Sequence, residues 1–206
     1  MKIKKSLAAL TATVSIMALA TGCSSSGSSG VVDTQADKGL AVMGDTITYD
    51  PNYRPPLWKT EKEAKEQILW GLRQADLVKI SDEEVQFLWG CSPEEGAERV
   101  LALGAKLVMV TLGPKGCFLK NAQAEYRCGC PQVRTVDTTG AGDIFGGSAV
   151  SRFLELGKTP EQLTQEDLAY MARYASAAAS LSTEKSGAIP SIPTKEAVLQ
   201  KMQEAY

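Results

Sequence analysis

Residues 76–112 read DLVKISDEEVQFLWGCSPEEGAERVLALGAKLVMVTL, and this stretch decides the class of fold. Its two ends, 76–80 and 106–112, are apolar runs of strand length, and the second is the continuous kind that is buried on both faces of a parallel sheet. Between them, a serine is followed three residues later by a glutamate at 81–84 and again at 92–95, a pattern that opens helices. The stretch therefore predicts a strand, two helices and a second strand.

The same alternation extends toward the N-terminus. A strand candidate, DTITYD, runs from Asp45 to Asp50, and Thr60 with Glu63 opens a predicted helix that runs to about Ala75. Strands that alternate with helices indicate right-handed βαβ units, so we expect an α/β fold, a three-layer αβα sandwich. The remaining predicted elements are short strands at 117–120, 125–128 and 133–136 and helices at 142–156, about 165–182 and about 195–204.

Length and composition fit one globular domain and exclude several kinds of chemistry. The chain has 206 residues, 44% of them hydrophobic, and a formal net charge of -2, which gives no electrostatic basis for binding nucleic acid. It contains no histidine, which excludes triads and metal sites built on imidazole. The five cysteines are odd in number and lack paired C-x-x-C spacing, which favours free thiols over a zinc site or a complete disulfide framework.

The first residues have the organisation of a bacterial lipoprotein leader. Three lysines among the first five residues precede a short apolar run, and the LATGC that follows resembles a lipobox ending at Cys23. We expect a lipoprotein-type signal peptide at 1–23, a Ser/Gly-rich linker at 24–35 and a domain at 36–206. The expected location is the membrane, through a lipid on Cys23, or the cytoplasm if the N-terminus is an artefact or is not processed.

The candidate reactive segment is TVDTTGAGDIFGG at 135–147, where glycines and an acid stand at the predicted start of a helix. Open α/β sheets bind ligands where strands lead into helices, and glycines let backbone amides approach an anion closely. The amides of 140–143 could hold a phosphoryl group while Asp143 accepts the proton of an attacking hydroxyl. A tight turn followed by an acidic helical turn explains the same residues, and a dinucleotide-binding glycine loop explains them less well.

Five segments carry a resemblance to a known family. TVDTTGAGD resembles a signature of the PfkB family of sugar kinases, the ribokinase-like kinases, and DPNYRPPLW at 50–58 resembles a segment of the family's bacterial and plant fructokinases. A strand-to-helix segment of the family is similar to VKISDEE at 78–84, and its nucleotide loop is similar to VTLGPKG at 110–116. The family's adenine-side helix with its exit loop is similar to AAASLSTEKSGAIPS at 177–191. The resemblance covers about residues 40–206 and is nearest to fructokinase.

The resemblance implies a kinase of a small sugar such as fructose, with ATP as phosphoryl donor, Mg2+ as cofactor and a monovalent cation such as K+. Asp143 would deprotonate the sugar hydroxyl, and Gly140, Ala141 and Gly142 would form an anion hole for the transferring group. The other implied contacts are Thr111, Gly113, Gly116 and Ser176 on the nucleotide, Arg54 on its phosphate side, Glu84 on magnesium through water, and Asp137 and Thr139 on the monovalent cation.

Several of these positions also have a structural explanation. Ser81 and Glu84 stand where the family has an asparagine and a glutamate, and their spacing is equally that of a capping box. Ser176 stands where ribokinases have an asparagine. Residues 111–116 also fit a β-hairpin turn, and residues 50–58 also fit a rigid proline turn.

The resemblance resumes inside a predicted helix just before Thr46, so we expect the family's N-terminal strands and its β-lid to be missing. The sheet would then have an open apolar edge for a second copy or a partner to cover, and few groups would position the sugar. Two functions follow from the sequence. The first is an ATP-dependent, fructokinase-like sugar kinase with reduced or lost activity, and the second is a non-catalytic, lipid-anchored module that binds a nucleotide or a partner.

Overall fold

The computed structural model describes residues 34–35, 40–43 and 46–206 of the chain. The predicted signal peptide, its lipobox cysteine Cys23 and most of the predicted linker lie outside these residues and stay predictions. Within the described ranges, no helix combines the length and the apolar character needed to cross a membrane.

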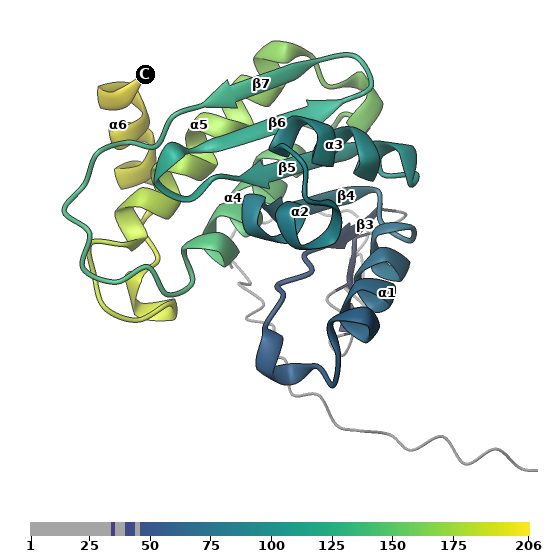
Figure 1. Cartoon of the computed structure of the whole chain (residues 1–206). Helices are drawn as coiled ribbons and strands as arrows, with labels where there is room; N and C mark the ends of the chain where they lie inside the picture. The colour runs from purple at the N-terminus through teal and green to yellow at the C-terminus, as the bar shows by residue number, and fades with distance from the viewer. Residues whose placement is uncertain (1–33, 36–39, 44–45) are drawn as a thin grey trace, which may run out of the picture.

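A seven-stranded mixed sheet forms the centre of the molecule, and its strands pair in chain order. Figure 1 shows β3 to β7 side by side in this order. The pairs β3–β4 and β4–β5 are parallel, as the βαβ pattern predicts, and the other pairs are antiparallel. The strands are β1 (Thr34–Gln35), β2 (Leu40–Met43), β3 (Thr46–Tyr49), β4 (Leu77–Ser81), β5 (Leu107–Thr111), β6 (Cys117–Asn121) and β7 (Glu125–Cys128).

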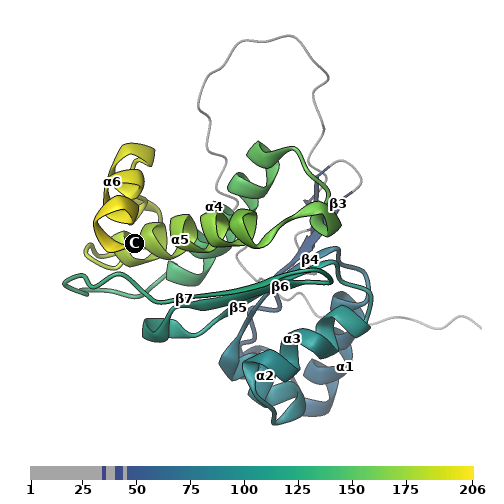
Figure 2. The same cartoon turned by 90° about the horizontal axis from the view of Figure 1, so that it is seen from above.

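Helices lie on both faces of the sheet (Figure 2). The first layer contains α1 (Glu61–Leu72), α2 (Asp82–Trp89) and α3 (Pro93–Ala102), and the second contains α4 (Ala141–Leu156), α5 (Gln165–Ser182) and α6 (Lys195–Ala205), with α6 packed on α5. Short 3-10 turns lie at Pro55–Leu57, Gly113–Lys115, Pro160–Gln162 and Ile189–Ser191. The expected three-layer αβα sandwich is confirmed.

The central strands are buried on both faces because each face carries its own apolar cluster. On β5, Leu107 and Met109 join the cluster formed with α4 and α5. The alternate residues Val108 and Val110 join the cluster formed with α1, α2 and α3. On β4 the same period of two places Lys79 on the face covered by α4, in an otherwise apolar strand.

Local capping signals set where the helices begin. The predicted boxes Ser81–Glu84 and Ser92–Glu95 are both present, each with a serine side chain and a glutamate side chain bonded to the other's backbone amide. The Thr60 hydroxyl accepts an amide of the first turn of α1. Because these contacts lie within four residues of one another, the sequence alone could place them.

Two predicted elements are wrong. Residues 133–136 form no strand, because the amides of Val136 and Asp137 donate to the carbonyl of Thr183 at the end of α5 instead of to a neighbouring strand. The family resemblance implies a helix just before Thr46, but residues 40–43 form β2, which pairs with β3. The edge of β3 that we expect to be open is therefore paired with β2. An apolar run of four residues fits a strand or a helix equally well, and the segment it packs against decides which of the two it forms.

Candidate active site

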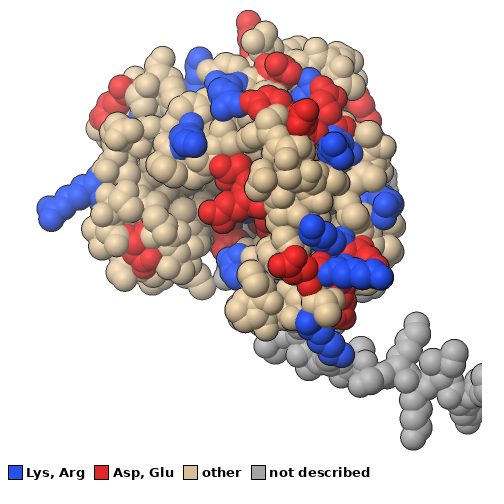
Figure 3. All heavy atoms as spheres, viewed as in Figure 1, with Lys and Arg blue, Asp and Glu red and all other residues tan. Residues whose placement is uncertain are grey.

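A cavity of about 500 Å³ lies where β3, β4 and β5 end and α4 begins. This is the edge at which open α/β sheets bind ligands. Figure 3 shows acidic side chains gathered in a hollow near the middle of this face. The acids that line the cavity are Asp82, Glu83, Glu84 and Asp143. A site this acidic would bind a polyphosphate together with cations rather than alone.

The first turn of α4 faces this cavity. Gly140 caps the helix with a left-handed φ of 79°, and Asp143, the third helical residue, is exposed on the cavity wall. The amide of Ala141 donates to the carbonyl of Thr138 (3.2 Å). Since the first amides of a helix have no acceptor within it, Gly142 and Asp143 are better placed than Ala141 to donate to an anion.

Glu84 joins two segments that lie far apart in the sequence. Its Oε2 accepts from the amide (2.8 Å) and hydroxyl (3.1 Å) of Ser81, which completes the capping box of α2. Its Oε1 accepts from the amide of Tyr53 (2.7 Å), in the turn that follows β3. The capping explanation for Glu84 is thus correct, and the same carboxylate also holds the turn that carries Arg54 against α2.

The turn after β3 forms one wall of the cavity. Tyr53 stacks on Phe87 of α2, with ring centroids 4.1 Å apart, and residues Pro55–Leu57 form a short 3-10 turn. Arg54 is exposed and lines the cavity, with its Nη1 donating to the carbonyl of Tyr53 (3.1 Å). The segment is therefore both a rigid proline turn and a wall of the site.

A second cavity, of about 480 Å³, adjoins the first. Thr111, Gly113, Thr138 and Gly142 line both cavities, so the two meet at the end of β5 and the start of α4. The second cavity extends between the loop after β7 and α5, and its walls are mainly apolar or small. The predicted nucleotide contacts Thr111, Gly113, Gly116 and Ser176 all line it.

Two of these nucleotide-side residues have clear structural constraints. Gly116 has a φ of 98°, and a Cβ there would lie 1.9 Å from the carbonyl oxygen of Cys128, so the tight turn before β6 requires glycine. Ser176 is buried on α5, with its Oγ 3.5 Å from the Sγ of Cys117. The cysteines at 91, 117, 128 and 130 are free thiols, as predicted.

Asp137 fastens the exit loop after α5 to the start of α4. Its Oδ2 accepts from the amide of Gly187 (2.9 Å) and its Oδ1 accepts from the amide of Thr139 (2.9 Å). These donors, Gly187 first, lower the pKa of Asp137 to about 2. A Cβ on Gly140 would lie 2.6 Å from that of Ala188, so the loop packs directly on the cap of α4. Asp137 and Thr139, the predicted cation ligands, are therefore adjacent and lie at this junction.

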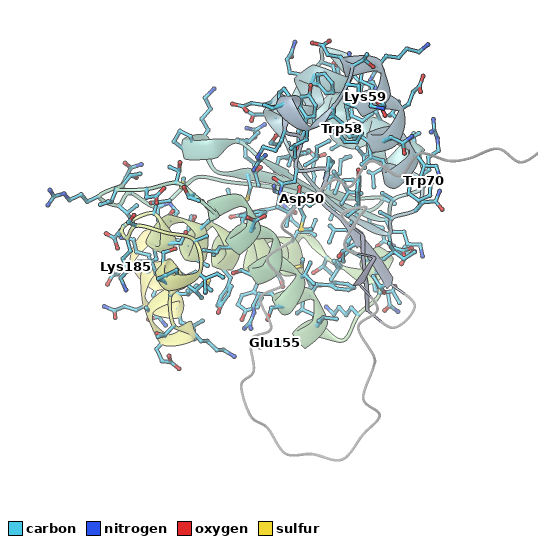
Figure 4. The ribbon with its side chains drawn as sticks, turned by 90° about the horizontal axis from the view of Figure 1, so that it is seen from below. Asp50, Trp58, Lys59, Trp70, Glu155 and Lys185 are labelled. Atoms are coloured by element: carbon cyan, nitrogen blue, oxygen red, sulfur yellow. The ribbon has the colours of Figure 1, made fainter. Side chains whose placement is uncertain are left out.

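Sequence reasoning missed one pair in the site. The Nζ of Lys79 on β4 lies 3.0 Å from the Oδ2 of Asp50, which directly follows β3. Lys79 is buried and Asp50 is half-buried, and the pair lies at the sheet, between the two helical layers, where Figure 4 shows Asp50. A lysine inside an otherwise apolar strand, and an acid at the end of the neighbouring strand, were the signals that could have found the pair.

The arrangement fits a nucleoside triphosphate and a divalent cation. The apolar second cavity has the character of a base and ribose site, and the acidic first cavity contains helix amides for phosphate. Magnesium prefers one or two carboxylates together with phosphate oxygens, and Glu84 and Asp143 supply such carboxylates at the cavity. A hydroxyl brought to Asp143 could lose its proton to that carboxylate while the helix amides receive the phosphoryl charge.

The chain belongs to the pfkB family of carbohydrate kinases, whose family model matches residues 4–195. Fructokinase-1 from Zea mays is 40% identical over 168 residues, which cover 79% of this chain and 50% of that protein. The resemblance stated from the motifs is confirmed.

Solved structures agree with the family and the fold. A double mutant of fructokinase from Vibrio cholerae O395, with fructose, ADP and potassium ion bound, superposes with a TM-score of 0.67 at 31% identity, covering 75% of this chain and 49% of that chain. A putative Ribokinase II from E. coli in complex with ATP and Mg2+ gives 0.65 at 26% identity, covering 76% and 48%. The fold is ribokinase-like, and the chain spans about half the length of the curated relatives it matches.

Proposed function

We propose that this chain binds ATP with Mg2+ across the two adjoining cavities and transfers the γ-phosphoryl group to a hydroxyl of a small sugar of the fructose class. The observation that carries the proposal is the position of Asp143: it lies in the first turn of α4, in the cavity that meets the apolar cavity at Gly142. A nucleotide in the apolar cavity would direct its phosphates past Gly142 toward Asp143.

Each predicted residue has a role in this proposal. Asp143 acts as the base, and the Gly140–Gly142 backbone with the Asp143 amide receives the phosphoryl charge. Arg54 binds the phosphates of the nucleotide, and Glu84 binds magnesium through water. Potassium binds at Asp137 and Thr139. The rest of the nucleotide is held by Thr111, Gly113, Gly116 and Ser176. Support comes from the family, from the ligands bound in the related structures, and from the cavities that these residues line.

The test is a coupled assay of ATP-dependent phosphorylation of fructose by the full chain, with ATP binding measured separately by calorimetry. Asp143→Asn should lower turnover by about 100- to 10,000-fold, the usual loss of a general base, with ATP affinity nearly unchanged. Asp82→Asn is the matched control in the same cavity; it should keep most of the turnover, because Asp82 Oδ1 accepts from the Glu83 amide (3.0 Å) and has no proposed role.

The same assay separates the second candidate, a nucleotide-binding module without turnover. That candidate is favoured by the extent of the match, which covers 50% of Fructokinase-1 from Zea mays, because positioning of the sugar supplies much of the rate in phosphoryl transfer. ATP binding without turnover would support the module, and neither binding nor turnover would refute both functions. Anchoring through Cys23 and assembly with a second copy or a partner are further proposals, tested by membrane fractionation and by the mass of the purified chain in solution.

A further inference from the structure

Lys79 is a buried cation at the first cavity, outside the roles proposed above for phosphoryl transfer. Its side chain is 10% exposed and its neighbours Val78 and Ile80 are fully buried. Taking an ammonium group out of water costs several kcal/mol unless it is paired and hydrogen-bonded. The Oδ2 of Asp50 supplies one partner, at 3.0 Å. An ammonium group has three N–H donors, so this bond engages one of them.

Two glycines of α4 form a groove for this side chain. A Cβ on Gly142 would lie 3.2 Å from the Nζ of Lys79, and a Cβ on Gly146 would lie 3.8 Å from its Cγ. Glycines four residues apart lie on one face of a helix, so the lysine passes along that face from Gly146 to Gly142. The ammonium group therefore lies beneath the first helical turn, at the wall of the first cavity.

The charges around Lys79 keep it ionised. Burial lowers its pKa, but the attraction of Asp50, Glu84 and Asp143 outweighs burial and raises the pKa above the usual lysine value. The three carboxylates come from the end of β3, the start of α2 and the start of α4. Among the described residues that line the first cavity, Lys79 is the one lysine, and it lies among acids and next to helix amides that are suited to an anion.

We infer that the Lys79 ammonium, held in the α4 groove by Asp50, is a binding group for the terminal phosphate of the nucleotide, and that Asp50 is its positioning residue. The inference rests on the proposed nucleotide binding at this site. A fixed cation beside the first-turn amides would meet the charge of the transferring group without moving, which is the kind of preorganised stabilisation that phosphoryl transfer needs. The groove admits an unbranched lysine stem better than the wider guanidinium of arginine.

The competing explanation is an ion pair that only joins β3 to β4. The two explanations differ in what they predict for ligands with and without phosphate. A phosphate-binding lysine discriminates ATP from adenosine, whereas a purely structural pair affects both ligands alike or neither.

The experiment measures ATP and adenosine affinity of the full chain by calorimetry, for the natural sequence and for Lys79→Met. We expect Lys79→Met to weaken ATP binding at least about 10-fold and to leave adenosine affinity within about twofold. Lys106→Met is the matched control. It breaks a similar pair with Asp76 (2.9 Å) near the opposite end of the sheet, and it should leave both affinities unchanged.

A second variant guards against a fold defect, because Lys79→Met leaves Asp50 without its partner. The double variant Lys79→Met/Asp50→Asn removes both charges, and such a replacement is usually tolerated better than removal of one. We expect it to unfold in urea close to the natural chain and still to bind ATP at least about 10-fold more weakly. A folded double variant with the natural ATP affinity would overturn the inference and leave the proposed function intact. If the natural chain binds neither ATP nor adenosine, the proposed function fails, and this inference fails with it.

Discussion

Replacing Glu84 by glutamine tests whether this carboxylate holds the turn after β3. Glu84 is buried and accepts three hydrogen bonds, from the Ser81 amide and hydroxyl and from the Tyr53 amide. Glutamine has the same shape but a single oxygen, so in either orientation its NH2 group meets an N–H donor. A lost charge-assisted bond costs about 1.5–3 kcal/mol and an unsatisfied buried donor costs about 1–3 kcal/mol. We expect Glu84→Gln to lower the free energy of unfolding by about 3 kcal/mol.

The matched control is Glu95→Gln, because the chain has a second capping box of the same design. Glu95 is exposed, and its side chain accepts from the Ser92 amide at 3.4 Å as part of that local box. We expect Glu95→Gln to lower the free energy of unfolding by about 0.5 kcal/mol, the usual upper limit for a substitution on the surface. The difference between the two variants isolates burial and the long-range bond to Tyr53.

The assay is urea unfolding of both variants beside the natural chain, with hydrogen exchange followed at the Tyr53 amide. Glu84→Gln should speed exchange at Tyr53, while Glu95→Gln should leave it unchanged. Equal losses of stability in the two variants, with unaltered protection of Tyr53, would refute the reasoning. Because the measurement needs no metal, it separates this structural role from any role of Glu84 on magnesium.

Three further predictions concern packing, pH and the exit loop. Gly71→Ala should lower the free energy of unfolding by about 2 kcal/mol, because the new Cβ would lie 2.4 Å from the Tyr49 ring. Gly147→Ala should not lower it, because no atom of the described residues lies within 4 Å of the new Cβ; the urea midpoints of the two variants are compared. Burial, opposed by the nearby lysine, raises the pKa of Asp50 from 3.8 to about 6, so the folded state binds this proton more tightly than the unfolded chain. The free energy of unfolding should therefore fall by about 2 kcal/mol as pH rises from 4 to 7, relative to Asp50→Asn; equal pH profiles would contradict it. Asp137→Asn should release the loop between α5 and α6, because the Asp137 carboxylate accepts from the Gly187 amide in this loop. Limited proteolysis should then cut the loop faster in the variant than in the natural chain and cut the rest of the chain at the same rate.

Much of the fold could be predicted from the sequence because its signals are local. Apolar runs of strand length, serines spaced three residues before glutamates and a glycine pair before Asp143 each depend on neighbours in the chain. These signals gave β4, β5 and the helices between them close to their observed bounds. The prediction was wrong at 133–136 and at 40–43, where short segments fit more than one structure and a distant partner decides.

The sequence by itself therefore determined the α/β class, the family through five ordered motifs, and Asp143 as the candidate base. Only the tertiary structure brought together Lys79 with Asp50, Glu84 with Tyr53, and Asp137 with Gly187, which are 29, 31 and 50 residues apart. The physical reason is that these contacts form between the ends of different strands and helices. Sequence pattern records which residues lie on one face of an element, but not which charged group of another element will lie opposite.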